Sequence, residues 1–182
     1  MISVTKMSIE EVLLLEYDAK EDNRGVTYKN FSKRELEAVG ISTEFVEERL
    51  YCIKKSGTLY GIHFQNHPTP QTKLLYCTKG RGLDFAIDLR KASKTYKKWV
   101  KIELSALNRR QIYIPAGFGH VFLSLEDDTH VVFRIDNYFD AGLELAITYK
   151  DDEINLEIAI ADPILSLQDR EAPMLRDSDC NL

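Results

Sequence analysis

The sequence predicts an all-β protein of the antiparallel sandwich or barrel type, the jelly roll included. Short segments rich in β-branched and aromatic residues recur at a spacing of roughly ten residues, and several alternate in polarity. Turn-forming stretches such as Lys79–Gly82 and Glu126–Asp128 separate them. The 182 residues contain no internal repeat, low-complexity tract or linker. We therefore expect one domain, residues 1–182, with a sizeable core.

The expected strands follow one another through the middle of the chain. They are the segment Gly57–Gln65 after its glycine turn, then Leu74–Cys77, Leu83–Leu89, Trp99–Leu104, Gln111–Ile114, Val121–Leu123 and His130–Ile135. Helical patterns are few. Ser32–Gly40 reads as a short helix that Ser32 would cap and Gly40 would end, and a second pattern lies near Pro163–Leu167.

Composition excludes several classes of protein. A net charge of -5 and a pI near 5.4 argue against a general binder of nucleic acid or of membrane surfaces. No apolar run approaches the ~20 residues that span a bilayer, and the N-terminus does not read as a secretory signal. Cys52, Cys77 and Cys180 are odd in number and widely spaced, which favours reduced thiols in a cytoplasmic protein.

Two segments each place one histidine on a short apolar strand after a turn that contains glycine. They are Gly57–Gln65 and Pro115–His120. Because side chains alternate between the faces of a strand, Gly61, His63 and Gln65 should share one face. A small residue, an imidazole and an amide in one row suit the inner wall of a barrel that holds a polar ligand.

Taken singly, these residues have ordinary structural explanations. A lone histidine such as His63 in an apolar strand is more often a hydrogen-bonded structural residue, and His120 could simply hold its turn. Lys73 alone would be a solvated lysine at a strand edge. Asp169 lies in a polar stretch, where a surface carboxylate or a helix cap is an equally ordinary role.

A series of short motifs, in order and with conserved spacing, nevertheless resembles the dTDP-4-dehydrorhamnose 3,5-epimerases and their sugar-nucleotide relatives. The motifs are Gly57-x-Leu59-x-Gly61-x-His63-x-Gln65, Pro70-Gln71-x-Lys73-Leu74, Asp84-x-Ala86-x-Asp88-Leu89-Arg90, Ser93, Trp99, Leu104-Ser105-Ala106-x-Asn108-Arg109-Arg110-Gln111, Ile114-Pro115-x-Gly117-Phe118-x-His120-x-Phe122 and Tyr138, with Asp22-x-Arg24-Gly25 upstream and Leu165-Ser166-x-x-Asp169 downstream. The resemblance implies a cupin-type jelly roll and a homodimer whose subunits exchange strands, with no metal or organic cofactor.

The resemblance also implies roles for individual residues. In a nucleoside-diphospho-4-keto-6-deoxy sugar the keto group acidifies C3 and C5, so a base can form an enolate and a returned proton can invert the carbon. His63 would be the base, Asp169 its carboxylate partner, and Lys73 a cation beside the enolate oxygen. Arg24 would reach the nucleotide from the other subunit, and His120 would hold a sugar or keto oxygen. The residues expected to contact substrate are Arg24, Tyr60, Gln65, His120, Phe133 and Tyr138.

Several positions depart from the family pattern. Phe133 stands where the family has a tyrosine that acts as the opposing acid, and Tyr60 replaces an arginine. The segments Val26–Lys29 and Glu47–Tyr51 also differ, which leaves the nucleotide base open. Strand alternation places Tyr60 on the face opposite His63, a poor substitute for the acid unless a bulge turns it. We therefore expect slower epimerisation, or epimerisation at one carbon, with C3 favoured.

Other function classes remain open. A 3,4-ketoisomerase would also use a lone histidine base, and a sugar-nucleotide-binding protein without catalysis would share the cavity. Pro115-x-Gly117-x-x-His120 resembles the second metal motif of cupins. However, His63-x-Gln65 lacks the second histidine of the usual pair, and no matched glutamate follows, so no metal site is expected.

Overall fold

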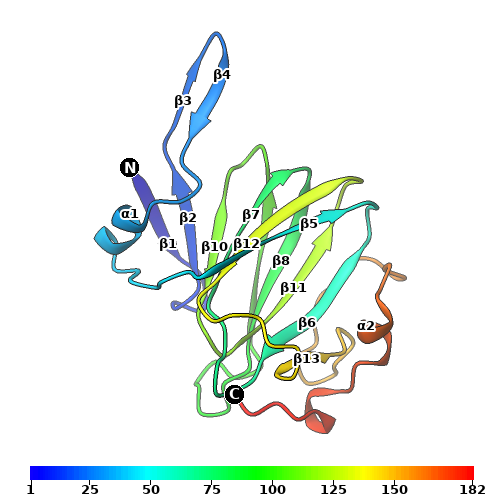
Figure 1. Cartoon of the computed structure of the whole chain (residues 1–182). Helices are drawn as coiled ribbons and strands as arrows, with labels where there is room; N and C mark the ends of the chain where they lie inside the picture. The colour runs from blue at the N-terminus through cyan, green and yellow to red at the C-terminus, as the bar shows by residue number, and fades with distance from the viewer.

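Two antiparallel sheets face each other across the core of the protein (Figure 1). The computed structural model describes all residues, 1–182. The six-stranded sheet has the order β1 (Ile2–Lys6), β2 (Leu13–Tyr17), β10 (Gln111–Ile114), β7 (Lys73–Lys79), β12 (Thr129–Ile135), β5 (Glu47–Ile53). The five-stranded sheet has the order β13 (Glu144–Ile147), β6 (Leu59–Gln65), β11 (Phe118–Ser124), β8 (Arg81–Asp88), β9 (Trp99–Ser105). From β5 onward the chain passes repeatedly between the sheets, so the predicted jelly roll is confirmed.

The predicted strands between residues 57 and 135 are present as β6 to β12, although their ends differ by a few residues. The sequence analysis did not identify β1, β2, β5 or the hairpin of β3 (Ala19–Asp22) and β4 (Gly25–Tyr28). These strands hold few buried residues: β5 alternates half-buried and exposed positions, and β3 is exposed throughout. The charged residues of β3 and β5 explain why these two strands do not stand out in the sequence, whereas β2, with three leucines, is apolar and was simply missed.

The first helix was predicted well and the second was not. Helix α1 (Lys33–Ala38) begins after Ser32, whose hydroxyl accepts a hydrogen bond from the backbone N–H of Glu35. The helix expected near Pro163–Leu167 is instead α2 (Leu167–Glu171), and a 3₁₀ turn, η1 (Leu175–Asp177), follows it. Ile164 lies in an extended bridge to Thr58, because this segment pairs with the start of β6.

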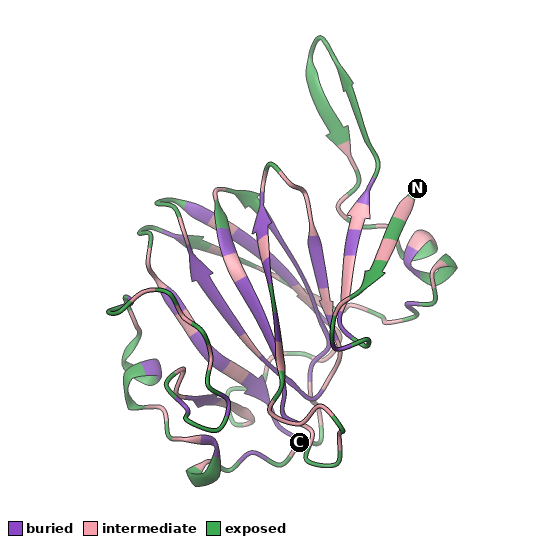
Figure 2. Ribbon diagram, turned by 180° about the vertical axis from the view of Figure 1, so that it is seen from behind, coloured by how far each residue is buried: buried purple, intermediate pink, exposed green.

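Buried residues lie along the strands of both sheets (Figure 2), and the buried apolar side chains form three clusters. The largest cluster lies between the sheets and includes Leu75, Val100, Phe122, Val131 and Phe133. A second cluster covers the outer face of the five-stranded sheet, where the C-terminal segment packs over Ile62, Phe85 and Val121. A third joins α1 to the outer face of the six-stranded sheet through Leu36 and Leu74. The C-terminal segment thus carries α2 to the edge of β6.

The β3–β4 hairpin projects away from both sheets (Figures 1 and 2). All of β3 and most of β4 are exposed, including Val26. A two-stranded hairpin is only marginally stable in water without something to pack against. No helix in the structure combines the length and the apolar character needed to cross a lipid bilayer.

Candidate active site

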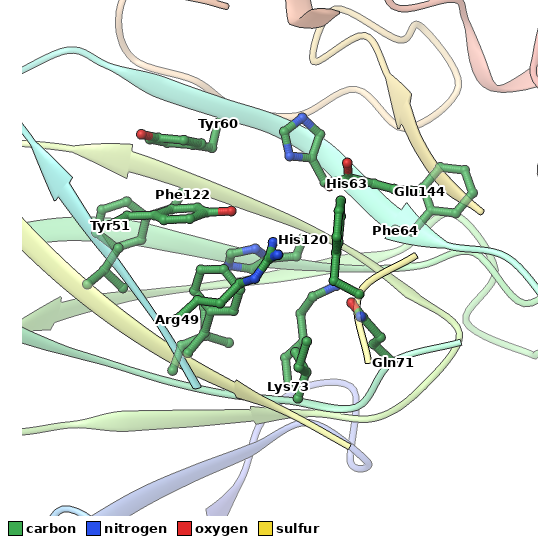
Figure 3. Close-up of a pocket in the computed structure, with 15 residues that line it drawn as sticks. Arg49, Tyr51, Tyr60, His63, Phe64, Gln71, Lys73, His120, Phe122 and Glu144 are labelled. Carbon is green, nitrogen blue, oxygen red and sulfur yellow. The ribbon is translucent and has the colours of Figure 1, made fainter. Parts of the chain in front are cut away.

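A cavity opens between the two sheets, and both sheets contribute side chains to it (Figure 3). Its lining consists of Arg49, Tyr51, Tyr60, His63, Phe64, Gln71, Lys73, Leu75, His120, Phe122, Val131, Phe133, Ile135, Phe139 and Glu144. One wall comes from β5, β7 and β12 of the six-stranded sheet, and the facing wall from β6 and β11 of the five-stranded sheet. Five of the predicted site residues meet here: His63, Lys73, Tyr60, His120 and Phe133.

A β-bulge in β6 brings Tyr60 and His63 to the same cavity, which corrects the face predicted for Tyr60. His63 pairs with His120 of β11, and Tyr60 pairs with Phe122, so two residues of β6 face one residue of β11. The extra residue breaks strict alternation. Tyr60 consequently enters the cavity beside His63.

His63 is bonded to a buried carboxylate at the edge of β6. His63 Nε2 lies 2.6 Å from Asp169 Oδ1, so the contact predicted between these residues is present. The same oxygen accepts the backbone N–H of Gly61 at 3.2 Å, and Asp169 Oδ2 accepts the hydroxyl of Ser166 at 2.7 Å. Ser166 also caps α2, so the start of this helix fixes the carboxylate.

The charge on Asp169 determines which nitrogen of His63 is free. Burial alone would raise the pKa of Asp169, but the hydrogen bonds from His63, Ser166 and Gly61 hold it below its usual value. A carboxylate only accepts hydrogen bonds, so Nε2 of His63 carries the proton of this pair. In the neutral imidazole the lone pair is then on Nδ1, which is the atom that can act as a general base.

Gly61 is required by the closeness of Asp169. A Cβ atom at residue 61 would lie 2.6 Å from Asp169 Oδ1 and 3.3 Å from its Cγ. Since β13 pairs only with Ile62–Gln65, the N–H of Gly61 is free to bond the carboxylate in place of a neighbouring strand. The glycine of the Gly-x-His motif thus leaves space for Asp169, the carboxylate partner of His63.

A second histidine–carboxylate pair lies on the same wall, and the sequence analysis did not identify its acidic member. His120 Nε2 lies 2.8 Å from Oδ2 of Asp84, which is completely buried on β8. The other carboxylate oxygen of Asp84 has no partner. Burial raises the pKa of Asp84, and the neighbouring His120 and Lys73 act in the opposite direction. The contact depends on the pairing of β8 with β11, and no pattern in the sequence indicates that pairing.

Lys73 brings an amine into the apolar interior of the cavity. The residue is 7% exposed, and burial lowers its pKa from 10.5 to about 8. The carboxylates of Glu144, Asp136 and Asp84 act against this shift. At neutral pH the amine therefore remains mostly protonated. A cation in such a poorly solvated place interacts strongly with any negative charge that develops beside it.

Strand β5 adds two cavity residues that were not predicted as site residues. Arg49 forms an ion pair with Glu47 at 2.7 Å and lies 4.1 Å from the centre of the Phe139 ring. Tyr51 stacks on Tyr60, with ring centres 4.9 Å apart. These positions form the half-buried face of β5. Alternation along Glu47–Tyr51 was a usable indication of this face, but no strand had been predicted there.

Three of the residues expected to contact substrate do not line the cavity. Gln65 is buried, and its amide bonds the carbonyls of Thr69 and Tyr138 at 2.6 and 3.2 Å, so it holds loops together. The Tyr138 side chain is 69% exposed. Arg24 lies on the projecting hairpin, where it pairs with Asp22 at 2.6 Å. The substrate contact expected for Gln65 is at odds with its buried position.

No group of three or more histidine, cysteine, aspartate or glutamate side chains is placed to hold a metal ion. The two histidines of the cavity wall instead each have a single carboxylate partner.

Proteins of one family are similar to this chain in sequence and in fold. The model of a family described as dTDP-4-dehydrorhamnose 3,5-epimerase matches residues 6–177. An enzyme of that name from Shigella flexneri is 37% identical over 179 residues, which cover 98% of each chain. A solved dTDP-4-dehydrorhamnose 3,5-epimerase from Bacillus anthracis, with TDP and PPi bound, is similar with a TM-score of 0.93 and 34% identity over 96% of this chain and 99% of that one.

A solved dTDP-6-deoxy-D-glucose-3,5-epimerase from Legionella pneumophila, in complex with dTDP-4-keto-L-rhamnose, gives a TM-score of 0.92 and 30% identity over 98% of this chain and 95% of that one. The resemblance found in the motifs is therefore confirmed. The chain belongs to the dTDP-4-dehydrorhamnose 3,5-epimerase family, whose members are sugar-nucleotide epimerases.

Proposed function

We propose that this epimerase uses His63 to remove a proton beside the keto group of a nucleoside-diphospho-4-keto-6-deoxy sugar. The observation that carries the proposal is the pairing of His63 with buried Asp169 at 2.6 Å, on the wall of a cavity that also holds Lys73. The carboxylate fixes the proton of a neutral imidazole on Nε2, which leaves Nδ1 as the atom that can take a proton, and it stabilises the imidazolium that then forms.

The first chemical step follows from this arrangement. The C–H bond at C3 or C5 breaks, its proton passes to Nδ1 of His63, and its electron pair moves into the keto group to form an enolate. The cationic amine of Lys73 stabilises the enolate oxygen. His120, held by Asp84 at 2.8 Å, is placed to hold a second oxygen of the sugar. A proton delivered to the other face of the carbon completes the inversion.

The active site is proposed to be shared between two copies of the chain. Arg24 lies on the exposed β3–β4 hairpin, which needs a partner to pack against. A two-fold dimer in which each hairpin reaches the partner's cavity would meet this need, and would bring Arg24 to the nucleotide. Light scattering at micromolar concentration should give a dimer, and a monomer would contradict the arrangement.

Mixing two variants tests the shared site directly. Arg24→Ala and His63→Asn should each be nearly inactive alone. When the two are co-expressed, a mixed dimer contains one site with both wild-type residues, so activity should reappear. No recovery in isolated mixed dimers would show that Arg24 and His63 serve a site within one chain.

Three free cysteines, Cys52, Cys77 and Cys180, support a reducing, cytoplasmic location.

The reaction itself is tested with a substrate panel in deuterated water. Thymidine, cytidine and guanosine diphosphate 4-keto-6-deoxy sugars are incubated with the wild-type protein, and NMR locates the deuterium. We expect deuterium and inverted configuration at C3, or at C3 and C5, with one nucleotide preferred and no loss of activity after chelation. Absence of exchange with every sugar would overturn the proposal, as would a product whose keto group has moved from C4 to C3.

A further inference from the structure

Inversion at carbon requires an acid on the side of the sugar opposite the base. His63 belongs to β6 of the five-stranded sheet. A sugar held in the cavity with one face toward His63 has its other face toward β5, β7 and β12 of the six-stranded sheet. A side chain of that wall is therefore placed to deliver the second proton.

Few groups on that wall can supply a proton. Phe133 lines it with a phenyl ring, which has no acidic proton, and the guanidinium of Arg49 stays protonated. Lys73 would lose its charge by acting as the acid, at the moment when the enolate oxygen depends on that charge. The remaining acid is the phenol of Tyr51.

The position of Tyr51 suits this task. Its ring meets the Phe133 ring edge-on, with centres 4.7 Å apart, and stacks on Tyr60 at 4.9 Å. These two contacts hold the ring in place. Figure 3 shows the Tyr51 hydroxyl pointing into the cavity toward Arg49, whereas the hydroxyl of the stacked Tyr60 points away from His63.

The surroundings of Tyr51 keep its proton available. Burial raises the pKa of the phenol, so it stays protonated at neutral pH, while the nearby charge of Arg49 acts in the opposite direction. A phenolate formed by proton transfer would lie beside that guanidinium, which stabilises it.

We propose that the hydroxyl of Tyr51 delivers the proton that completes inversion. The proposal rests on the function of His63 given above. The O–H bond of Tyr51 breaks and a C–H bond forms on the face opposite His63, as the enolate returns to a ketone. Water then reprotonates the phenolate and removes the proton held by His63, so protons balance over the cycle. Tyr51 on β5 thus performs the step that Phe133 on β12 cannot.

The test separates solvent exchange from inversion. In deuterated water, Tyr51→Phe should keep deuterium exchange at the sugar carbon, because His63 still removes the proton and returns a deuteron to the same face. Inversion relative to exchange should fall by about 10²-fold, a usual size for the loss of a general acid. Wild-type inversion in Tyr51→Phe would overturn the proposal. Failure of the wild-type protein to exchange at all would instead contradict the role of His63.

Three further variants complete the experiment. Tyr60→Phe removes the competing phenol and should keep the wild-type ratio of inversion to exchange, whatever its effect on KM; loss of inversion there would assign the acid to Tyr60. Tyr96→Phe removes a phenol packed on the outer face of the five-stranded sheet and should match the wild type. Adding Phe133→Tyr to Tyr51→Phe should restore inversion, because the two rings are in contact. A double variant as deficient as Tyr51→Phe would contradict the equivalence of the two positions.

Discussion

The two walls of the cavity are organised in different ways. On the five-stranded wall, His63 and His120 are each bonded to a buried carboxylate, and Asp169 is fixed in turn by Gly61 and Ser166. On the six-stranded wall, packing sets the position of Tyr51, which lies between two aromatic rings, and the Lys73 side chain is buried.

This difference indicates which catalytic side chains can be moved to another strand while the reaction is kept. A shift of either partner weakens the 2.6 Å contact between the base and its carboxylate, so the positions of both are constrained. An acid held by aromatic packing needs only a ring and a hydroxyl within reach of the sugar. A phenol can therefore move from β12 to the adjacent strand β5 while the base remains on β6.

The largest loss of activity is expected on the five-stranded wall, where the histidines are bonded to carboxylates. Asp169→Asn should lower kcat by about 10²-fold or more, because a neutral amide cannot stabilise the imidazolium of His63. Stopped-flow exchange in deuterated water measures the rate, and circular dichroism checks the fold. Activity equal to that of the wild type would show that the carboxylate has only a structural role. The difference proposed between the two walls would then be wrong.

Replacing Lys73 tests the contribution of the six-stranded wall to catalysis. Lys73→Met should lower kcat by about 10²-fold, the usual cost of removing one electrostatic partner of a developing oxyanion. In the wild type, kcat should fall as pH rises above about 8, because Lys73 then loses its proton and its charge. Lys73→Met should lack this decline. A variant with the same alkaline decline would assign the titration to another group.

The same variant should increase stability. The pKa of Lys73 falls from 10.5 to about 8 on folding, so the native protein holds the proton less tightly than the unfolded chain. The cost of the buried charge is complete below pH 8 and disappears as the pH rises to 10.5. It corresponds to about 3 kcal/mol. Urea unfolding at pH 7 should find Lys73→Met more stable, with exposed Lys6→Met as the unchanged control.

Gly61→Ala should have a smaller effect, of about tenfold on kcat, by moving Asp169 away from His63. The added Cβ would lie 2.6 Å from the carboxylate oxygen, so the side chain must shift, and small misplacements of catalytic groups cost rates of this order or more. Gly142→Ala, in an exposed loop, is the matched control. Unchanged kcat in Gly61→Ala would mean that the position of Asp169 is not critical.

The smallest effect is expected for Ser166→Ala. The change removes one hydrogen bond to Asp169 and the cap of α2, which should cost about 1 kcal/mol of stability. Activity should fall only slightly, since Gly61 still holds the carboxylate. Thermal unfolding and kcat measured together test this ranking. A loss of activity as large as that of Asp169→Asn would show that Ser166, and not Gly61, makes the contact with Asp169 that orients the base.

The sequence was sufficient for the fold and for the pair of His63 with Asp169, and it was insufficient for parts of both walls. The motif around His63 and the downstream Asp169 predicted a contact that the structure contains. The bulge in β6 could not be read from alternation, because one extra residue reverses the face of Tyr60. Tyr51 was missed because β5 is too polar to read as a strand. Asp84 depends on pairing between β8 and β11, which a single sequence does not display.

The most direct test of the account is solvent exchange in His63→Asn. The preferred 4-keto sugar is incubated in deuterated water with wild type, His63→Asn, and His130→Asn, in which a histidine bonded to exposed Asp128 is changed. If His63 is the base, exchange at the sugar carbons falls by at least ~10²-fold in His63→Asn, while His130→Asn keeps the wild-type rate and both variants remain folded. Exchange at the wild-type rate in folded His63→Asn would contradict the proton-abstraction mechanism.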